Sequence, residues 1–220
     1  MEWDKQRDRD KWLHTWEGEP VKMSEARVFK NWRVDDLDDQ VPEGCVPRLG
    51  ADWGFVNDPS VLVECYVWGR TLYIRREAWR LKLETDDTPA FWAGDDWLDP
   101  ENPRWANRHG FRGIETARRH RVIADSARPE TISYMQKRGF NVTASRKGPN
   151  SVVEGVEFLK SFDVVIHPDC THVEDEWTHY SYKEDELTGE VLPVLKDKKN
   201  HTVDSVRYAL EDVRRPQGGG

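Results

Sequence analysis

Three short segments of the sequence place a lone aspartate where a carboxylate could do chemistry. Asp52 follows the apolar residues 49–51, and Asp125 follows the apolar residues 122–124. Asp204 lies three residues after His201, in a segment with the pattern of a helix. A buried carboxylate costs much free energy unless it is paired or binds a metal ion. We therefore expect the three aspartates to share a divalent-metal site, as in enzymes that hydrolyse phosphodiesters.

Each of these residues also has an ordinary structural alternative. Asp52 could form a turn, Asp125 could cap the helix that follows it, and Asp204 could be a solvated helix residue. His201 projects from the same helix face as Asp204. It could bind metal, or orient or protonate a leaving group near neutral pH, or simply bond locally. Asp58 could support the metal site, but its Asn-Asp-Pro-Ser segment is also an ordinary turn.

Basic residues in two segments are candidates for contact with phosphate groups. Arg146 and Lys147 lie in a loop that follows an expected strand, and Lys196, Lys198 and Lys199 come just before the last expected helix. Contacts of this kind position a nucleic acid without reading its sequence. They fit an enzyme that cuts with little sequence preference.

The acidic balance of the chain is the main objection to a nucleic-acid role. The net charge is -8, whereas DNA-binding proteins usually carry a basic footprint. The charges are segregated, however: residues 84–101 hold seven acids and no Lys or Arg, and residues 104–121 hold six arginines and one acid. These segments could be two solvated faces, or a basic rim beside the site with an acidic lid or partner surface. Metal-binding carboxylates also add negative charge that a bound cation would offset.

Length and cysteine content restrict the class of protein. With 220 residues the chain is expected to form one domain with appendages. It contains no apolar run of the roughly 18–20 residues that a membrane helix needs, and no signal peptide. Its three widely spaced cysteines argue against a disulfide framework and favour a reducing compartment.

The histidines and the cysteine within residues 167–172 could suggest a zinc site. Their spacing matches no closed four-ligand pattern. We expect them to lie in a buried strand and at the start of a helix instead.

The first half of the chain predicts a tail followed by an antiparallel meander. Residues 1–47 read as an N-terminal linker or tail, because tryptophans alternate with charges and prolines interrupt any regular element. Three strands are then expected, joined by tight turns, and an irregular, Trp-rich insertion follows them. The expected strands are 48–55, 61–68 and 71–78, and the insertion spans about 84–110.

Helices and strands alternate over the second half, as in an α/β domain with a mixed central β-sheet flanked by helices. The first strand and the strand before Asp125 can lie side by side, which brings Asp52 and Asp125 together, and the last helix can carry Asp204 to them. The domain is expected to span 48–213, with a flexible tail over 214–220. The expected helices are 114–120, 129–138, 150–161, 173–180 and 201–213, the strands are 121–125, 140–144 and 164–167, and a hairpin is expected over 186–194.

This order of elements and acids resembles the RNase H-like (retroviral-integrase) nuclease superfamily. Within it, the sequence is most similar to the C-terminal nuclease domain of tailed-bacteriophage terminase large subunits. The resembling segments are GADWGFVNDP at 50–59, ADSA at 124–127, RKGPNS at 146–151 and NHTVDSVRYA at 200–209. Residues 14–19 also resemble the linker that leaves the family's packaging ATPase. The resemblance covers about 12–213, and since no Gly-x-x-x-x-Gly-Lys-[Ser/Thr] phosphate loop occurs in the sequence, the ATPase half is missing from it.

The resemblance implies an RNase H-like fold and a two-metal endonuclease of viral DNA packaging. In that superfamily carboxylates hold two divalent ions about 3.5–4 Å apart, and Mg²⁺ or Mn²⁺ suits such oxygen ligands. Asp52 would bridge both ions, and Asp125 and Asp204 would each complete one site. The implied substrate is double-stranded concatemeric DNA, and the implied partners are the ATPase domain, the terminase small subunit and the portal or procapsid. The implied location is the cytoplasm of the infected bacterial host.

Two other functions remain open at this level. One is another RNase H-like nuclease, such as a resolvase. The other is a docking or DNA-binding module of the packaging motor with weak or no cleavage, which the acidic insertion and the net charge favour.

Overall fold

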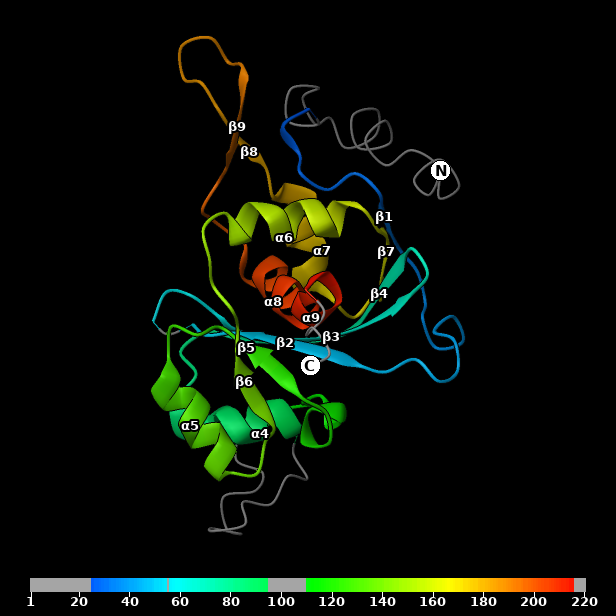
Figure 1. The fold of residues 1–220 in the computed structure, drawn as a ribbon, viewed down its shortest axis with the longest axis vertical. Coiled ribbons are helices and arrows are strands. Elements are labelled where there is room, and N and C mark those ends of the chain that lie inside the picture. Colours follow the sequence, from blue (N-terminus) through cyan, green and yellow to red (C-terminus); the bar gives the residue numbers. More distant parts are fainter. Residues whose placement is uncertain (1–24, 55, 95–109, 216–220) are drawn as a thin grey trace.

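A seven-stranded mixed β-sheet forms the centre of the computed structural model, which describes residues 25–54, 56–94 and 110–215 (Figure 1). The strands lie in the order β1-β7-β4-β3-β2-β5-β6. Their bounds are β1 Trp32–Val34, β2 Arg48–Asp52, β3 Ser60–Trp68, β4 Thr71–Arg80, β5 Val122–Ala124, β6 Val142–Ala144 and β7 Asp163–Ile166. The fold is therefore the mixed α/β, RNase H-like sheet that the sequence predicts.

Strands β2, β3 and β4 form the predicted antiparallel meander. Asp52 at the end of β2 pairs with Val61 of β3, and Ser60 pairs with Arg80 at the far end of β4. The turn between β3 and β4 contains Gly69, whose φ of +59° lies in the left-handed region that glycine tolerates best.

The remaining strands add to the meander in parallel. Strand β5 pairs with β2, so that Ala51 lies opposite Ala124, and the N–H of Asp125 donates to the carbonyl of Ala51 at 2.9 Å. On the other side β7 pairs with β4, and β1 pairs with β7. Because parallel strands end at the same edge of a sheet, Asp52 and Asp125 lie together, which confirms the predicted pairing.

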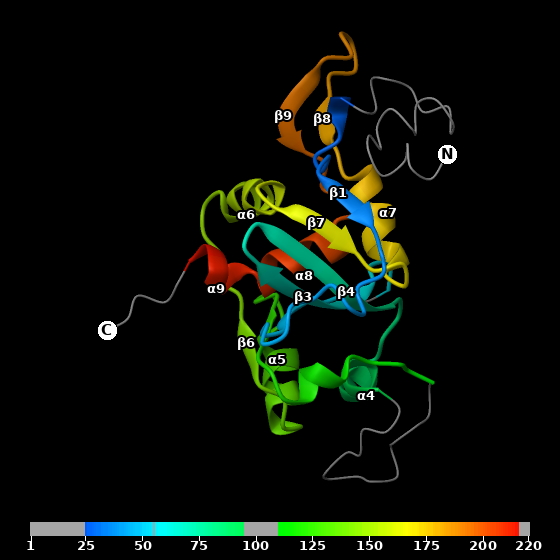
Figure 2. The ribbon, with the colours of Figure 1, turned by 90° about the vertical axis from the view of Figure 1, so that its right-hand side faces the viewer.

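Helices cover both faces of this sheet (Figures 1 and 2). One group packs with β3 and β4 in the larger hydrophobic core, and a second group packs with β2, β5 and β6 in a smaller core on the opposite face. The first group comprises α6 Ser151–Lys160, α7 Thr171–His179, α8 His201–Ala209 and α9 Glu211–Arg214. The second comprises the 3₁₀ turn η2 Thr85–Asp87, α4 Thr88–Ala93, the 3₁₀ turn η4 Glu115–Arg118 and α5 Pro129–Lys137.

Helix α8 lies directly on the backbone of β2. A Cβ atom added to Gly50 would lie 1.8 Å from the carbonyl oxygen of Ser205 and 2.5 Å from the backbone nitrogen of Ala209. Only glycine leaves room for this approach. The close contact brings the first turn of α8, with Asp204, to the end of β2.

The predicted N-terminal tail differs from the structure over its described part, residues 25–47. Strand β1 joins the sheet, Leu37 is fully buried, and Phe29 stacks on Trp177 of α7 with ring centroids 4.6 Å apart. A strand of three residues is too short to show a periodic pattern, and its position depends on pairing with β7. Residues 1–24 of the predicted tail lie outside the described residues.

The predicted insertion 84–110 is only partly visible, because residues 95–109 also lie outside the described residues. Its first part is not irregular: it forms η2 and α4, and α4 buries Phe91 and Trp92 in the smaller core. The final helix is divided at Leu210 into α8 and α9. The last residues of the predicted tail, 216–220, are not described either.

The predicted hairpin forms a separate two-stranded sheet, β8 Tyr182–Glu184 and β9 Val191–Leu195. The outer end of this hairpin projects beyond the main sheet (Figure 2), whereas Tyr182 and Leu195 at its base pack against the larger core. Val191, Leu192 and Val194 of β9 are exposed.

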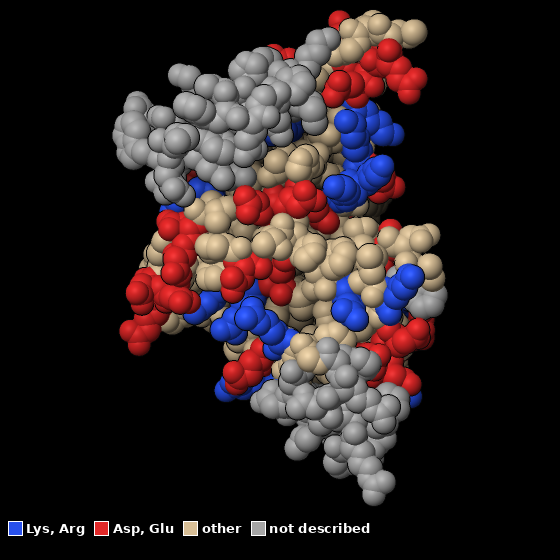
Figure 3. All heavy atoms as spheres, turned by 180° about the vertical axis from the view of Figure 1, so that it is seen from behind, with Lys and Arg blue, Asp and Glu red and all other residues tan. Residues whose placement is uncertain are grey.

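Acidic and basic side chains intermix on the face seen in Figure 3. None of the helices in the described ranges combines the length and the apolar character that crossing a bilayer requires.

Candidate functional site

The three predicted aspartates surround one cavity of about 240 Å³. Asp52 is the last residue of β2, Asp125 follows β5 directly, and Asp204 lies in the first turn of α8. The cavity is lined by Asp52, Asp125, Arg146, Lys147, Ser151, Val152, Asp204, Arg207, Tyr208, Glu211 and Arg214. Three segments that are far apart in the sequence therefore bring their carboxylates to one place.

Asp52 is paired with His201. The Nδ1 atom of His201 lies 3.0 Å from Oδ2 of Asp52, and its Nε2 atom lies 3.6 Å from Oδ1 of Asp58. Burial raises the pKa of Asp52, and the hydrogen bond to His201 opposes this shift. The same bond, as the largest cause, raises the pKa of His201. The imidazole thus lies between two carboxylates, and both of them favour its protonated form.

Asp125 is held on three sides. Its carbonyl oxygen accepts a hydrogen bond from Nε1 of Trp53 at 2.8 Å, and its Oδ1 atom accepts one from the N–H of Ala127 at 3.3 Å. The Nζ atom of Lys147 lies 2.5 Å from the same Oδ1 atom. Helix α5 begins four residues later, at Pro129, so Asp125 is not its N-cap.

The carboxyl group of Asp204 is strongly perturbed by burial. Burial raises its pKa to about 7, nearby Arg207 lowers it, and the charge of Asp52 raises it further. Its oxygens accept hydrogen bonds from Nη1 of Arg207 at 2.9 Å and from Nδ2 of Asn200 at 3.3 Å. The cations of the chain therefore offset only part of the cost of burying this charge.

This donor set fits divalent cations that prefer oxygen ligands. The charge of Asp125 raises the pKa of Asp52, and the charge of Asp52 raises that of Asp204, so Asp52 interacts with both other acids. Asp52, Asp125 and Asp204 do not bring three ligand atoms to within 4.8 Å of one another. In the described part of the chain, only Asp36, Asp38 and His167 do so.

The cluster of Asp36, Asp38 and His167 has the wrong hydrogen bonding for a metal site. The N–H of Asp169 donates to Nδ1 of His167 at 3.1 Å. The neutral ring then carries its proton on Nε2, so Nε2 cannot bind a metal ion. A metal-bound histidine usually binds through one ring nitrogen and donates a hydrogen bond from the other, whereas here Nδ1 accepts one. Both aspartates of the cluster are exposed.

Cys170 and His172 of the zinc-like segment 167–172 pack against the main sheet and its core. Cys170 is buried in the larger core, and His172 stacks on Trp79 with ring centroids 4.3 Å apart. Nδ1 of His172 also lies 2.7 Å from Oε1 of Glu77. These contacts agree with the predicted positions at a buried strand and a helix start.

Arg146 and Lys147, which the sequence predicts to contact phosphate, have different surroundings. Both line the cavity, but Arg146 is engaged by the C-terminal segment: its backbone N–H and its Nε each donate to Glu211 at 2.7 Å. Its Nη2 atom also donates to Asp212 at 3.2 Å and to the carbonyl of Arg215 at 3.1 Å. Lys147 points to Asp125 alone among the described residues.

The predicted lysines before α8 do not line this cavity. Lys196 lies 4.0 Å from Glu184 of the hairpin, and Lys199 lies 3.4 Å from Asp175 of α7. Lys198 is exposed in the same turn.

Two site residues were not anticipated from the sequence. Arg207 lies three residues after Asp204, and that helical spacing could have identified it. Glu176 of α7 contacts the start of α8 from another helix, and no sequence pattern marks it.

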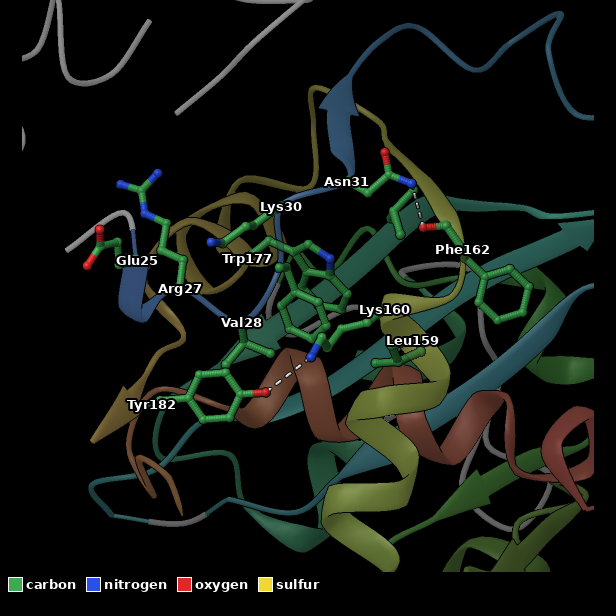
Figure 4. Close-up of a pocket in the computed structure, with 12 residues that line it drawn as sticks. Glu25, Arg27, Val28, Lys30, Asn31, Leu159, Lys160, Phe162, Trp177 and Tyr182 are labelled. Atoms are coloured by element: carbon green, nitrogen blue, oxygen red, sulfur yellow. Dashed lines mark hydrogen bonds between the residues drawn. The ribbon is translucent and has the colours of Figure 1, made fainter. Parts of the chain in front are cut away.

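A second cavity, of about 340 Å³, lies near the start of the described chain and contains none of these acids (Figure 4). Val28, Leu159 and Trp177 give it an apolar lining. Nζ of Lys160 donates to the hydroxyl of Tyr182 at 3.2 Å across it.

Comparison with known proteins gives a consistent assignment. The family model described as "Terminase RNAseH like domain" matches residues 52–212. The large terminase subunit of Bacillus phage SPP1 is 30% identical over 216 residues, which cover 94% of this chain and 46% of that protein. The PBSX phage terminase large subunit of Bacillus subtilis strain 168 is 29% identical over 168 residues, or 75% of this chain and 34% of that protein. The chain thus spans less than half the length of these relatives.

A solved structure supports the same assignment. The large-terminase nuclease domain of bacteriophage SPP1, with bound manganese, matches with a TM-score of 0.67 and 26% identity. The match covers 84% of this chain and 98% of that domain. The sheet, the three acids at its edge and the family match lead to one conclusion: the chain belongs to the terminase RNase H-like domain family, the family of large-terminase nuclease domains.

Proposed function

We propose that this chain is a metal-dependent endonuclease that cuts double-stranded DNA. The observation that carries the proposal is the meeting of Asp52, Asp125 and Asp204, from β2, β5 and α8, around one cavity. Family membership and the manganese-bound SPP1 relative support it.

In this proposal Asp52, Asp125 and Asp204 would hold two divalent ions, Mg²⁺ or Mn²⁺, and Asp52 would serve both. Its central place is supported by its charge interactions with both other acids. When bound, such ions supply an activated water and stabilise the leaving oxygen of a phosphodiester. The buried, incompletely offset carboxylates of Asp52 and Asp204 are the groups that gain most from added positive charge.

Residues of the chain have two further tasks in the reaction. Hydrolysis adds a water oxygen to phosphorus, breaks one P–O bond and leaves an oxygen that needs a proton. His201 is held by Asp52 in a state that favours protonation, so it can orient or protonate that oxygen. Lys147 is the cation at the cavity that can turn from Asp125 to a DNA phosphate.

For the whole protein we propose the part that this family implies. The chain would be the nuclease half of a terminase large subunit that cuts concatemeric viral DNA, acting with an ATPase domain, a small subunit and the portal or procapsid. Its place of action would be the cytoplasm of the infected bacterial host.

Plasmid cleavage tests the activity. The purified chain should convert supercoiled DNA to nicked and linear forms with Mn²⁺ or Mg²⁺ and not with EDTA. Asp52→Asn should lower the rate by about 100-fold or more, since metal ions contribute several kcal/mol to the transition state. Asp125→Asn and Asp204→Asn should do the same.

Asp38→Asn is the matched control, because it removes a carboxylate of the exposed cluster outside the cavity. It should cut like the unmodified chain. Undiminished cutting by two of the three cavity variants, shown to be folded, would contradict the site.

A further inference from the structure

The start of helix α8 is held by a residue of another helix. Its own N-cap, Asn200, gives no capping bond, and the Asn200 side chain turns to Asp204 instead. One oxygen of Glu176, Oε2, accepts from the N–H of Thr202 at 2.8 Å, from its hydroxyl at 2.6 Å and from the N–H of Val203 at 3.2 Å. Glu176 of α7 thus replaces the missing cap.

These three bonds lie between the two site residues of α8. His201 is the first residue of the helix and Asp204 the fourth, and the bonded groups belong to residues 202 and 203. Glu176 is 5% exposed, and Thr202 and Val203 are fully buried. Since water has little access there, the N–H groups have no ready replacement for this acceptor.

Helix α7 is anchored in the same way. Glu77 of β4 accepts from the N–H of His172 at 2.9 Å and from the N–H of Val173 at 2.8 Å. The buried carboxylate of Glu77 therefore connects the sheet to α7, and the buried carboxylate of Glu176 connects α7 to α8. A carboxylate at a helix N-terminus is favoured by the partial positive charge of the exposed N–H groups.

We propose that Glu176 is a positioning residue of the nuclease site. It fixes the first turn of α8, so that Nδ1 of His201 reaches Asp52 and the carboxylate of Asp204 faces the cavity. Glu176 acts through α8 and touches no reacting atom. This role rests on the proposed function, because the geometry that it maintains is that of the proposed metal site.

Glu176→Ala tests the role. It should lower kcat by about 10–100-fold, the usual effect of losing a group that supports a metal ligand. It should leave KM for DNA unchanged and weaken the binding of Mn²⁺ alone, measured by calorimetry. Glu176→Gln should restore most of kcat and of the Mn²⁺ affinity, because its amide oxygen can accept hydrogen bonds at the same place.

The ring signals of His201 in nuclear magnetic resonance spectra give a readout that needs neither metal nor activity. These signals should shift in Glu176→Ala, and in Glu176→Gln they should lie close to their positions in the unmodified chain. If the alanine variant fails to fold, Thr202→Val serves instead: it removes one of the three donors and should give a smaller change of the same kind.

Ile132→Val in the smaller core is the control for a loss of stability alone, and it should change neither kcat nor the His201 signals. A folded Glu176→Ala protein with unchanged kcat, Mn²⁺ binding and His201 signals would overturn the positioning role. Failure of the unmodified chain to cut with any metal would instead count against the proposed nuclease, while the His201 signals would still decide the role of Glu176.

Discussion

Each aspartate of the site has a basic residue of the chain beside it. Asp52 is paired with His201, Asp125 with Lys147 and Asp204 with Arg207. These pairs make the carboxylates tolerable in a buried position, and an incoming metal ion competes with them. The neighbouring residues Arg146 and Lys147 differ in this respect, because Lys147 is tied to a site acid and Arg146 to the C-terminal segment.

Lys147→Ala should weaken DNA binding in a salt-dependent way. Removal of one phosphate contact lowers the slope of log K against log salt by about 1. Binding isotherms of a short duplex at several salt concentrations, with Asp52→Asn to prevent cutting, give this slope.

Arg146→Ala should act on stability instead. It leaves the buried carboxylate of Glu211 without its main partner, which should cost about 1–3 kcal/mol in the free energy of unfolding. Denaturant unfolding measures this loss. A reduced salt slope for Arg146→Ala at full stability would show that Arg146 contacts DNA after all.

The Glu77–His172 pair should make stability depend on pH. The hydrogen bond to Glu77, as the largest cause, raises the pKa of His172 above its ordinary value of 6.5. The stabilisation is fully present below that value and is lost as the pH rises through the higher pKa of the folded state. The stability advantage of the unmodified chain over His172→Gln should therefore be larger at about pH 6 than at about pH 9. An equal difference at both pH values in chemical unfolding would contradict this.

The sequence could predict that Asp52, Asp125 and Asp204 lie around one cavity, because a charge directly after an apolar run, or at helical spacing from a histidine, is visible locally. Prediction from sequence did not work for Glu176, whose role depends on how two helices pack. The sequence also does not show that Glu211 lies beside Arg146, so the role of Arg146 in DNA contact stays a prediction.

At the level of elements, the contact between β2 and α8 sets the geometry of the site. Gly50→Ala would place a methyl group against the carbonyl of Ser205, so it must push the helix away from the strand. We expect a loss of about 1–3 kcal/mol or more in stability, and slower cleavage because Asp204 moves with the helix. Thermal unfolding and plasmid cleavage measure the two effects.

Gly148→Ala is the matched control for this change. A Cβ at Gly148 meets no atom within 4 Å, and stability should be unchanged. Equal stability of both alanine variants would mean that α8 does not sit as closely on β2 as described.

Most elements were predictable because alternating apolar residues, turn residues and a proline at the start of α5 leave local signals. The exceptions have physical reasons. Strand β1 is too short for any period and is defined by its neighbour β7. Helix α4 lies in the segment predicted to be an irregular, Trp-rich insertion, although its aromatic residues are buried in the smaller core.

For the molecule as a whole, residues 25–47, the described segment before β2, are part of the domain. Phe29 is buried against Trp177 and Tyr180, so Phe29→Ala should cost about 3–5 kcal/mol in the free energy of unfolding. A domain that began at residue 48 would not be affected. Urea unfolding distinguishes these outcomes. A change below about 1 kcal/mol in the free energy of unfolding would support the predicted start of the domain at residue 48.

The dependence of the site on α8 has a consequence during protein synthesis. The strands that carry Asp52 and Asp125 are made first, and each can pair with its neighbour as it leaves the ribosome. The third acid arrives only with residues 201–209, which must then dock on a strand made about 150 residues earlier. A growing or prematurely ended chain therefore lacks a complete set of acids. Under the proposed function, an unfinished copy of the chain would be unable to cut DNA until α8 has docked on β2.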